Sequence, residues 1–174
     1  MTNPKWLVWM QQVQALAQDG LAYSQNPFDI ERYHLLRNLA ARIVAEYGPE
    51  EFERIDELFS GEAGYATPKL DARGVVFREG KLLLVKELLD GGWTLPGGWV
   101  DVGESPGSAV EREVFEESGF RVRAVKLLAI FDRNNPRHGH PAYIFQIYKM
   151  FFLCELTGGE AADSIETSGA AFFG

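Results

Sequence analysis

One stretch of the chain, residues 98–120, restricts the fold more than any other, because it contains the start and the end of a helix. Ser105 is a residue type that caps exposed backbone N–H groups, and Pro106 has φ preset for the first helical position. Gly119 adopts the left-handed conformation at little cost, so it is the expected end. The sequence therefore predicts a helix between Ser105 and Gly119, preceded by a glycine-rich loop.

Carboxylates interrupt the apolar stripe of this helix. At helical spacing the stripe runs through Ala109, Val110, Glu113, Val114 and Glu117. Glu116 lies beside them, so Glu113, Glu116 and Glu117 share one face. Like charges on one face raise one another's pKa unless a cation lies among them, and Mg²⁺ or Mn²⁺ would supply that charge through hard oxygen ligands. A solvated acidic face is the alternative, but the position of the acids within an apolar stripe favours a metal site.

The same stretch resembles the Nudix box, G-x5-E-x7-R-E-U-x-E-E-x-G-U, in which U is a bulky apolar residue. All of the specified positions match: Gly98, Glu104, Arg112, Glu113, Val114, Glu116, Glu117, Gly119 and Phe120. The resemblance covers about residues 70–173 and implies an α/β fold, the Nudix α/β/α sandwich around a mixed sheet. It also implies a hydrolase that cleaves a nucleoside diphosphate linked to another group.

The resemblance further implies roles for individual residues. Glu113, Glu116 and Glu117 would hold the metal, with the Gly97 carbonyl as a further ligand. The base that deprotonates water would be one of these glutamates or a glutamate on a later loop. Glu166, which precedes the last aromatic strand, is the preferred loop candidate, and Glu160 is the other.

Other side chains near the box have expected roles outside the metal site. Glu104 and Arg112 are expected to pair and to tie the loop to the helix. Arg133, Arg137 and Lys149 are candidate phosphate contacts, and Tyr148 is a candidate for stacking on a base. His138 and His140 are possible acid–base groups, although loop histidines are more often solvated.

Charge is unevenly distributed in this chain of net charge −8. Residues 121–150 contain one acid, Asp132, and six bases: Arg121, Arg123, Lys126, Arg133, Arg137 and Lys149. A basic segment after an acidic helix suits a small ligand that carries phosphates. A nucleic-acid partner is not expected, because no broad basic surface is present.

The composition predicts a globular cytoplasmic protein. No run approaches the roughly 20 apolar residues of a membrane helix, and the N-terminus has no pattern of a secretion signal. Cys154 is the only cysteine, so an internal disulfide is excluded and a reducing compartment fits.

The first 61 residues predict a small all-helical unit. Helical spacing of apolar residues extends over residues 4–18, from Asn26-Pro27 to Gly48-Pro49, and from Phe52 to about Gly61, and Asp19-Gly20 is the expected end of the first helix. These helices have more apolar surface than they can bury alone, so we expect them to dock on the catalytic domain or on a second subunit, and a homodimer is expected. Residues 62–68 are the expected linker, and residues 69–174 the Nudix domain.

The Nudix domain is expected to be rich in strands. Residues 73–77 and 81–86 predict a hairpin, followed by a short strand at 93–95. Further strands are expected at 121–132, 142–155 and 170–173, with a polar loop at 157–166. The Nudix fold normally has a second helix after its last strand, and none is present before Gly174. The N-terminal helices would cover that face unless the natural chain is longer.

The N-terminal segment is similar to that of bacterial Nudix proteins with a helical extension, a group that includes CDP-choline pyrophosphatases and proteins described as ADP-ribose pyrophosphatases. Conversion of CDP-choline to CMP and phosphocholine is therefore the first hypothesis. Choline would require an aromatic cage, and the available aromatics are Trp6, Trp9, Tyr23, Phe28 and Tyr33. The alternatives are hydrolysis of ADP-ribose or a nucleotide sugar, hydrolysis of an RNA end or strand, and a non-catalytic nucleotide-sensing module.

Overall fold

The computed structural model describes residues 4–138 and 143–174, and the chain divides into two compact units. One unit contains Met1–Pro68 together with Arg133–Gln146. The other contains Lys69–Asp132 and Ile147–Gly174. The first unit therefore includes a segment, residues 133–146, that the sequence alone places inside the Nudix domain.

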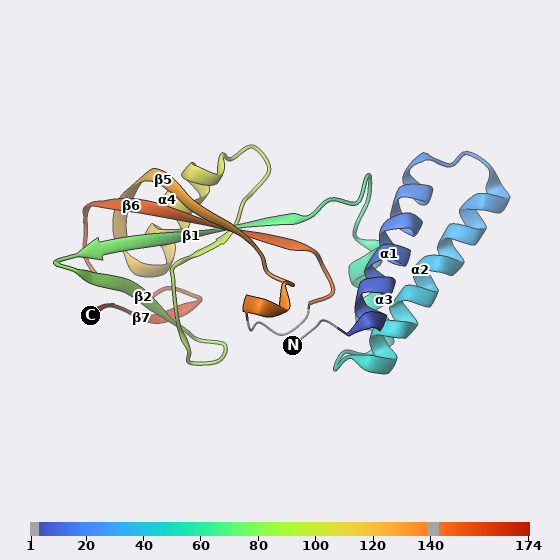
Figure 1. Ribbon diagram of the computed structural model, residues 1–174, viewed down its shortest axis with the longest axis horizontal. Coiled ribbons are helices and arrows are strands. Elements are labelled where there is room, and N and C mark those ends of the chain that lie inside the picture. Colours follow the sequence, from blue (N-terminus) through green and yellow to red (C-terminus); the bar gives the residue numbers. More distant parts are fainter. Residues whose placement is uncertain (1–3, 139–142) are drawn as a thin grey trace. The chain divides into compact units, whose positions relative to one another are not determined.

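Three helices form most of the first unit: α1 (Lys5–Tyr23), α2 (Pro27–Tyr47) and α3 (Phe52–Ser60). The Asn26 side chain caps α2 by accepting a hydrogen bond from the Phe28 N–H. Helix α1 continues past Gly20, so its predicted end was wrong. Gly20 is a packing position, because a Cβ there would lie 2.3 Å from the Tyr33 ring. The absence of a side chain at Gly20 lets α1 and α2 run close together (Figure 1).

The end of the segment 133–146, from Tyr143 to Phe145, packs against these helices. Ile144 and Phe145 contact the helical core, whose buried members are Leu7, Met10, Ala40, Ala41, Val44, Ile55 and Phe59. The Gln11 amide donates to the Tyr143 carbonyl at 2.9 Å, and the Asn134 amide donates to the Phe145 carbonyl at 2.9 Å. A short 3-10 helix, η1 (Pro136–His138), lies in this segment.

A seven-stranded sheet forms the second unit (Figure 1). Its strands are β1 (Lys69–Arg78), β2 (Lys81–Glu87), β3 (Trp93–Thr94), β4 (Gly97–Trp99), β5 (Phe120–Asp132), β6 (Ile147–Gly159) and β7 (Thr167–Phe173). The order is β3-β2-β1-β6-β5, with β4 paired to β1 and β7 paired to β2. Only the β1–β6 pair is parallel, so the predicted mixed sheet is confirmed.

Helix α4 (Pro106–Ser118) packs on this sheet and has the predicted ends. The Ser105 hydroxyl accepts a hydrogen bond from the Ser108 N–H, and Gly119 has φ 76°. Val110 and Val114 enter the core beside Gly74, where a Cβ would lie 2.5 Å from a Val114 methyl. The missing side chain at Gly74 lets the helix lie close to β1.

Several strand predictions differ from the structure. Strand β1 begins at Lys69, ahead of the predicted residue 73, and Gly97–Trp99, expected within the glycine-rich loop, form strand β4. Strand β6 begins at Ile147, where residues 142–155 were expected, and it continues to Gly159. The end of β6 was predicted as loop because it contains glycines. Strand β6 instead pairs with the whole length of β5, and the Thr157 hydroxyl donates to the Arg121 carbonyl. Strand β7 begins at Thr167, ahead of the predicted 170–173, because it pairs along β2. Ala142, the predicted start of one strand, lies outside the described residues.

No helix within the described ranges combines the length and the apolar character needed to cross a bilayer.

Candidate active site

Two glycines in β4 bring the acidic helix against the sheet. A Cβ at Gly98 would lie 2.8 Å from the Glu113 carboxylate. At Gly97, φ is 142° and a Cβ would lie 2.1 Å from the Ala72 carbonyl oxygen. A side chain at Gly98 would therefore push Glu113 away from β4, and a side chain at Gly97 would separate β4 from β1.

The glutamates predicted as metal ligands line one cavity of about 1070 Å³ in the sheet unit. Glu113, Glu116 and Glu117 come from α4, and Glu166 comes from the loop before β7. Glu117 is buried and accepts a hydrogen bond from the Gly97 N–H at 2.8 Å. The Thr167 hydroxyl donates to the Glu117 carbonyl at 2.6 Å, which ties β7 to the helix at this residue. Glu160, the other loop candidate, is exposed and does not line the cavity.

Burial makes two of these carboxylates harder to ionise. Burial raises the pKa of Glu117 to about 7, and the charges of Glu113 and Glu166 act in the same direction. The Gly97 N–H and the Arg73 guanidinium partly oppose this increase. The pKa of Glu113 is also raised, mainly by burial. A cation among these groups would favour their ionised forms.

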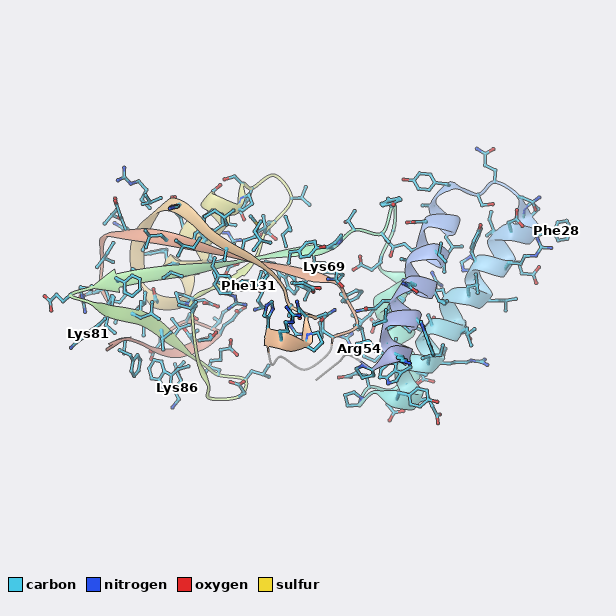
Figure 2. The ribbon with its side chains drawn as sticks, in the orientation of Figure 1. Phe28, Arg54, Lys69, Lys81, Lys86 and Phe131 are labelled. Atoms are coloured by element: carbon cyan, nitrogen blue, oxygen red, sulfur yellow. The ribbon has the colours of Figure 1, made fainter. Side chains whose placement is uncertain are left out.

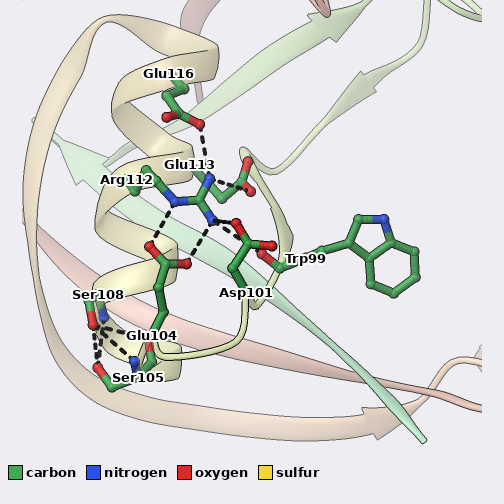
Figure 3. A network of polar contacts seen from close by, with 8 residues as sticks. All are labelled: Trp99, Asp101, Glu104, Ser105, Ser108, Arg112, Glu113 and Glu116. Carbon is green, nitrogen blue, oxygen red and sulfur yellow. Dashed lines mark hydrogen bonds and ion pairs between the residues drawn. The ribbon is translucent and has the colours of Figure 1, made fainter. Parts of the chain in front are cut away.

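Arg112 joins the loop to the helix (Figure 3). Its guanidinium donates to both carboxylate oxygens of Glu104, at 2.9 and 2.8 Å, which confirms the predicted pair. It also donates to Glu113 and Glu116, each at 2.9 Å, a pair of contacts that the box pattern did not indicate. Arg112 is therefore the internal counter-charge of this acidic cluster.

The carboxylates fit a divalent ion by donor type, but their present orientation is not that of a metal site. Among the described side chains, no three His, Cys, Asp or Glu groups are arranged to hold one ion. One oxygen of Glu113 and one of Glu116 face Arg112, and one of Glu117 faces the Gly97 N–H. Each glutamate has a second oxygen, so hard donors are available on the wall of one cavity. Gly97 lines the same cavity, as its predicted role as a ligand requires.

The predicted phosphate contacts fall in both units. Arg133 and Arg137 belong to the helical unit: the Arg133 guanidinium lies 4.9 Å from the centre of the Tyr143 ring, and Arg137 is exposed in η1. Lys149 and the half-exposed Tyr148 are neighbours on β6. The roles of these four residues stay predictions. Of the two histidines, His138 is exposed at the end of η1, and His140 lies outside the described residues.

Arg73 is a cavity residue that the sequence reasoning missed. Its guanidinium forms a fork with Asp71, with both distances 2.8 Å, and donates to the Leu95 carbonyl at 3.2 Å. The Lys149 ammonium lies 3.5 Å from the same Asp71 carboxylate. Both Asp71 and Arg73 line the cavity, so one carboxylate holds two cations at its wall. The signal was present in the sequence, because residues i and i+2 of a strand share a face.

Comparison with known proteins agrees with this architecture. Residues 68–173 match the family model of the NUDIX domain, and residues 4–59 match the model described as the UDP-X-like, N-terminal oligomerisation domain. The Bacillus subtilis (strain 168) protein YjhB, whose name classes it provisionally as an ADP-ribose pyrophosphatase, is 45% identical over 169 residues, which are 97% of this chain and 80% of YjhB.

Two solved structures are also similar. The crystal structure of a UDP-X diphosphatase is 32% identical, covers 99% of this chain and 83% of its own, and superposes with a TM-score of 0.57. An ADP-ribose pyrophosphatase from Streptococcus suis is 46% identical, covers 62% and 75%, and gives a TM-score of 0.53. With the site geometry and the matched domain, this chain belongs to the Nudix family of hydrolases, with an N-terminal helical unit of the UDP-X-like type.

Proposed function

We propose that the protein hydrolyses the diphosphate bond of a nucleoside diphosphate linked to a second group, with ADP-ribose as the first substrate to test. The observation that carries this proposal is the cavity of the sheet unit, which is lined by Glu113, Glu116, Glu117 and Glu166 together with the half-buried cation Arg73. Such a site offers carboxylates for a metal and a fixed positive charge for a phosphate. Relatives named for ADP-ribose and for UDP-X support a nucleoside diphosphate derivative.

CDP-choline is the second candidate, and the helices do not favour it. The aromatics available for a choline cage are spread along α1 and the start of α2. Trp9 and Tyr23 are 14 positions apart on one helix, which separates them by about 21 Å. Trp6 stacks on Tyr47, with ring centres 5.4 Å apart. Trp9 and Tyr23 therefore cannot belong to one cage around a quaternary ammonium.

In the proposed mechanism, the glutamates of α4 would hold a metal ion, and a loop glutamate would accept a proton. A divalent ion, Mg²⁺ or Mn²⁺, would neutralise the diphosphate and lower the pKa of a bound water. Glu113, Glu116 and Glu117 would hold it with the Gly97 carbonyl, on a helix fixed at both ends. Glu166 lines the cavity without belonging to α4, and its backbone carbonyl accepts from the Leu88 N–H at 2.8 Å. Its proposed role is to accept the proton of the water that attacks phosphorus.

Arg73 would contact the diphosphate itself. Three of its N–H groups bond Asp71 and Leu95, which fixes the plane of the guanidinium, and the residue lines the cavity. A pre-oriented arginine loses little conformational freedom when it binds a phosphate. Lys149 balances the charge of Asp71 from the neighbouring strand, so Arg73 retains positive charge for the substrate.

The test is an assay of the purified protein against ADP-ribose, a UDP-sugar, CDP-choline, a nucleoside triphosphate and a short RNA, with Mg²⁺ or Mn²⁺. We expect one nucleoside diphosphate derivative to give a nucleoside monophosphate and a second phosphorylated product, and we expect EDTA to abolish turnover. Turnover of none of these compounds would refute the proposal. Binding of nucleotides without turnover would instead support the sensing module.

We also infer that the helical unit joins two copies of the chain as a homodimer. Large apolar side chains are exposed on α1 and α2: Val8, Trp9, Leu16, Tyr23, Phe28, Leu35, Leu36, Leu39 and Tyr47. Phe28, at the start of α2, projects from the ribbon in Figure 2 and is 68% exposed. An apolar surface of this extent is typical of a protein interface, and the family model for this segment is described as an oligomerisation domain.

The dimer is tested with a charge placed on that surface. Sedimentation should give twice the 19.5 kDa chain mass for the parent protein. Leu35→Glu should weaken association by at least about 100-fold, because each subunit would lose a leucine that the dimer buries and would gain a charge in its place. Ser60→Glu adds the same charge at an exposed site of α3 and should leave the mass unchanged. A monomeric parent protein, or equal effects of the two changes, would contradict the dimer.

A further inference from the structure

Large apolar side chains surround the mouth of the acidic cavity. Leu88, Leu89, Trp99 and Ile165 all line it. They are nevertheless exposed, with Leu89 at 95%, Ile165 at 94% and Trp99 at 46%. They come from β4 and from the loops that precede β3 and β7. Exposed apolar groups that gather at a charged cavity indicate a surface for part of a ligand.

Trp99 has the most defined position of the four. It pairs directly with Asp71 across β1 and β4, so the indole lies on the same face of the sheet as Asp71 and Arg73. Its backbone carbonyl accepts a hydrogen bond from Arg112 at 3.3 Å. Figure 3 shows the indole directed away from the Arg112 network. The ring is therefore held by a fixed strand and does not take part in the acidic cluster.

Trp99 and Arg73 lie on the paired strands β4 and β1. Arg73 pairs with Gly97, and Asp71 pairs with Trp99, two residues further along β4. Positions two residues apart in a strand are about 6.7 Å apart on one face. The Arg73 guanidinium bonds Asp71, the residue paired with Trp99. One face of the sheet thus presents a cation for phosphate and a flat aromatic surface on paired strands.

We propose that the indole of Trp99 stacks on the nucleobase of the substrate while Arg73 contacts the phosphate attached to that nucleoside. The proposal rests on the proposed function, and it names the group that the Nudix box leaves undefined. A nucleobase fits this position because it is planar, and every base has a π face that an indole can cover. Leu88, Leu89 and Ile165 would cover the edges of the stacked base.

Two probes separate the base from the phosphate: AMP and ribose 5-phosphate, which has no base. Both would be titrated into the full-length protein with Mg²⁺ present and followed by calorimetry. Trp99→Leu should weaken AMP binding by about 5- to 150-fold, the usual range for loss of one base–aromatic stack. Binding of ribose 5-phosphate should be unchanged. Trp99→Phe should recover part of the AMP affinity, since it restores an aromatic face.

Trp93 provides the matched control. It is 44% exposed, close to the value for Trp99, and it lies on the short neighbouring strand β3. Its ring packs edge-on against Phe173, with centres 4.7 Å apart, and it does not line the cavity. Trp93→Leu should therefore bind AMP as the parent protein does.

Three results would overturn the proposal: AMP does not bind the parent protein, Trp99→Leu weakens both probes equally, or Trp93→Leu has the same effect as Trp99→Leu. The measurement needs no turnover. Selective loss of AMP binding in a protein that hydrolyses nothing would refute the proposed function and leave the stacking role intact.

Discussion

Glu117→Gln will reduce kcat for the best nucleoside diphosphate substrate by about 10²- to 10⁴-fold at pH 8, the range expected when a charged group at the reaction centre is lost. Glutamine retains the size of the side chain and an oxygen that can accept the Gly97 N–H, so β4 should keep its position. It lacks the charge needed to hold a divalent ion. The loss should therefore be in catalysis rather than in folding, and circular dichroism should be unchanged.

Glu111→Gln is the matched control for this result. Glu111 lies on the same helix and accepts the Ala124 N–H at 2.8 Å, as Glu117 accepts the Gly97 N–H at 2.8 Å. It does not line the cavity. The kcat of Glu111→Gln should therefore remain within a few-fold of the parent value. The two variants are matched, because each substitution removes one carboxylate and retains one acceptor. Equal losses in the two variants would show that the helix, and not the site, had been damaged.

Glu117→Gln will stabilise the metal-free protein. The folded-state pKa of Glu117 is about 7, against an ordinary value of 4.5, because burial disfavours its charged form. The folded protein then binds more protons than the unfolded chain between these two values, so its stability falls as pH rises from 4.5 to 7. Glutamine has no charge to bury. Glu117→Gln should therefore be more stable than the parent above pH 7, by at most about 3 kcal/mol.

Urea unfolding in EDTA at pH 4 and at pH 8 measures this difference. The advantage of Glu117→Gln should be present at pH 8 and absent at pH 4, where the carboxyl is protonated in both states. Added Mg²⁺ should reduce the advantage, because an ion that binds only the folded parent protein stabilises it. An advantage that is the same at both pH values would contradict a burial penalty on the charge of Glu117.

Local signals in the sequence predicted the helix that carries the site. The ends of α4 depend on Ser105, Pro106 and Gly119, which act through neighbouring backbone groups, so they can be read without knowing the fold. The pairing of Glu104 with Arg112 was also predicted from the sequence, as a contact that ties the loop to the helix. The common cavity of Glu113, Glu116 and Glu117 was also expected, because helical spacing places them on one face.

Features that depend on distant parts of the chain were missed. Gly20 was predicted to end the first helix, but it lies inside α1, where it packs against the Tyr33 ring of α2. The glycines at the end of β6 read as loop, but β5 pairs with them. The spacing of Asp71 and Arg73 places them on one face of a strand, but only the fold brings that strand to the wall of the cavity. In each case a contact remote in sequence decided the structure.

The membership of residues 133–146 has a consequence for how the protein can be divided. The polypeptide passes between the two units three times, after Pro68, after Asp132 and after Gln146. A protein that begins at residue 69 would therefore keep Ile144 and Phe145 while losing the helical core that they contact. The helical unit is not an appendage that can be removed by a single cut. Exchange of whole modules between relatives would have to transfer this inserted segment together with the first 68 residues.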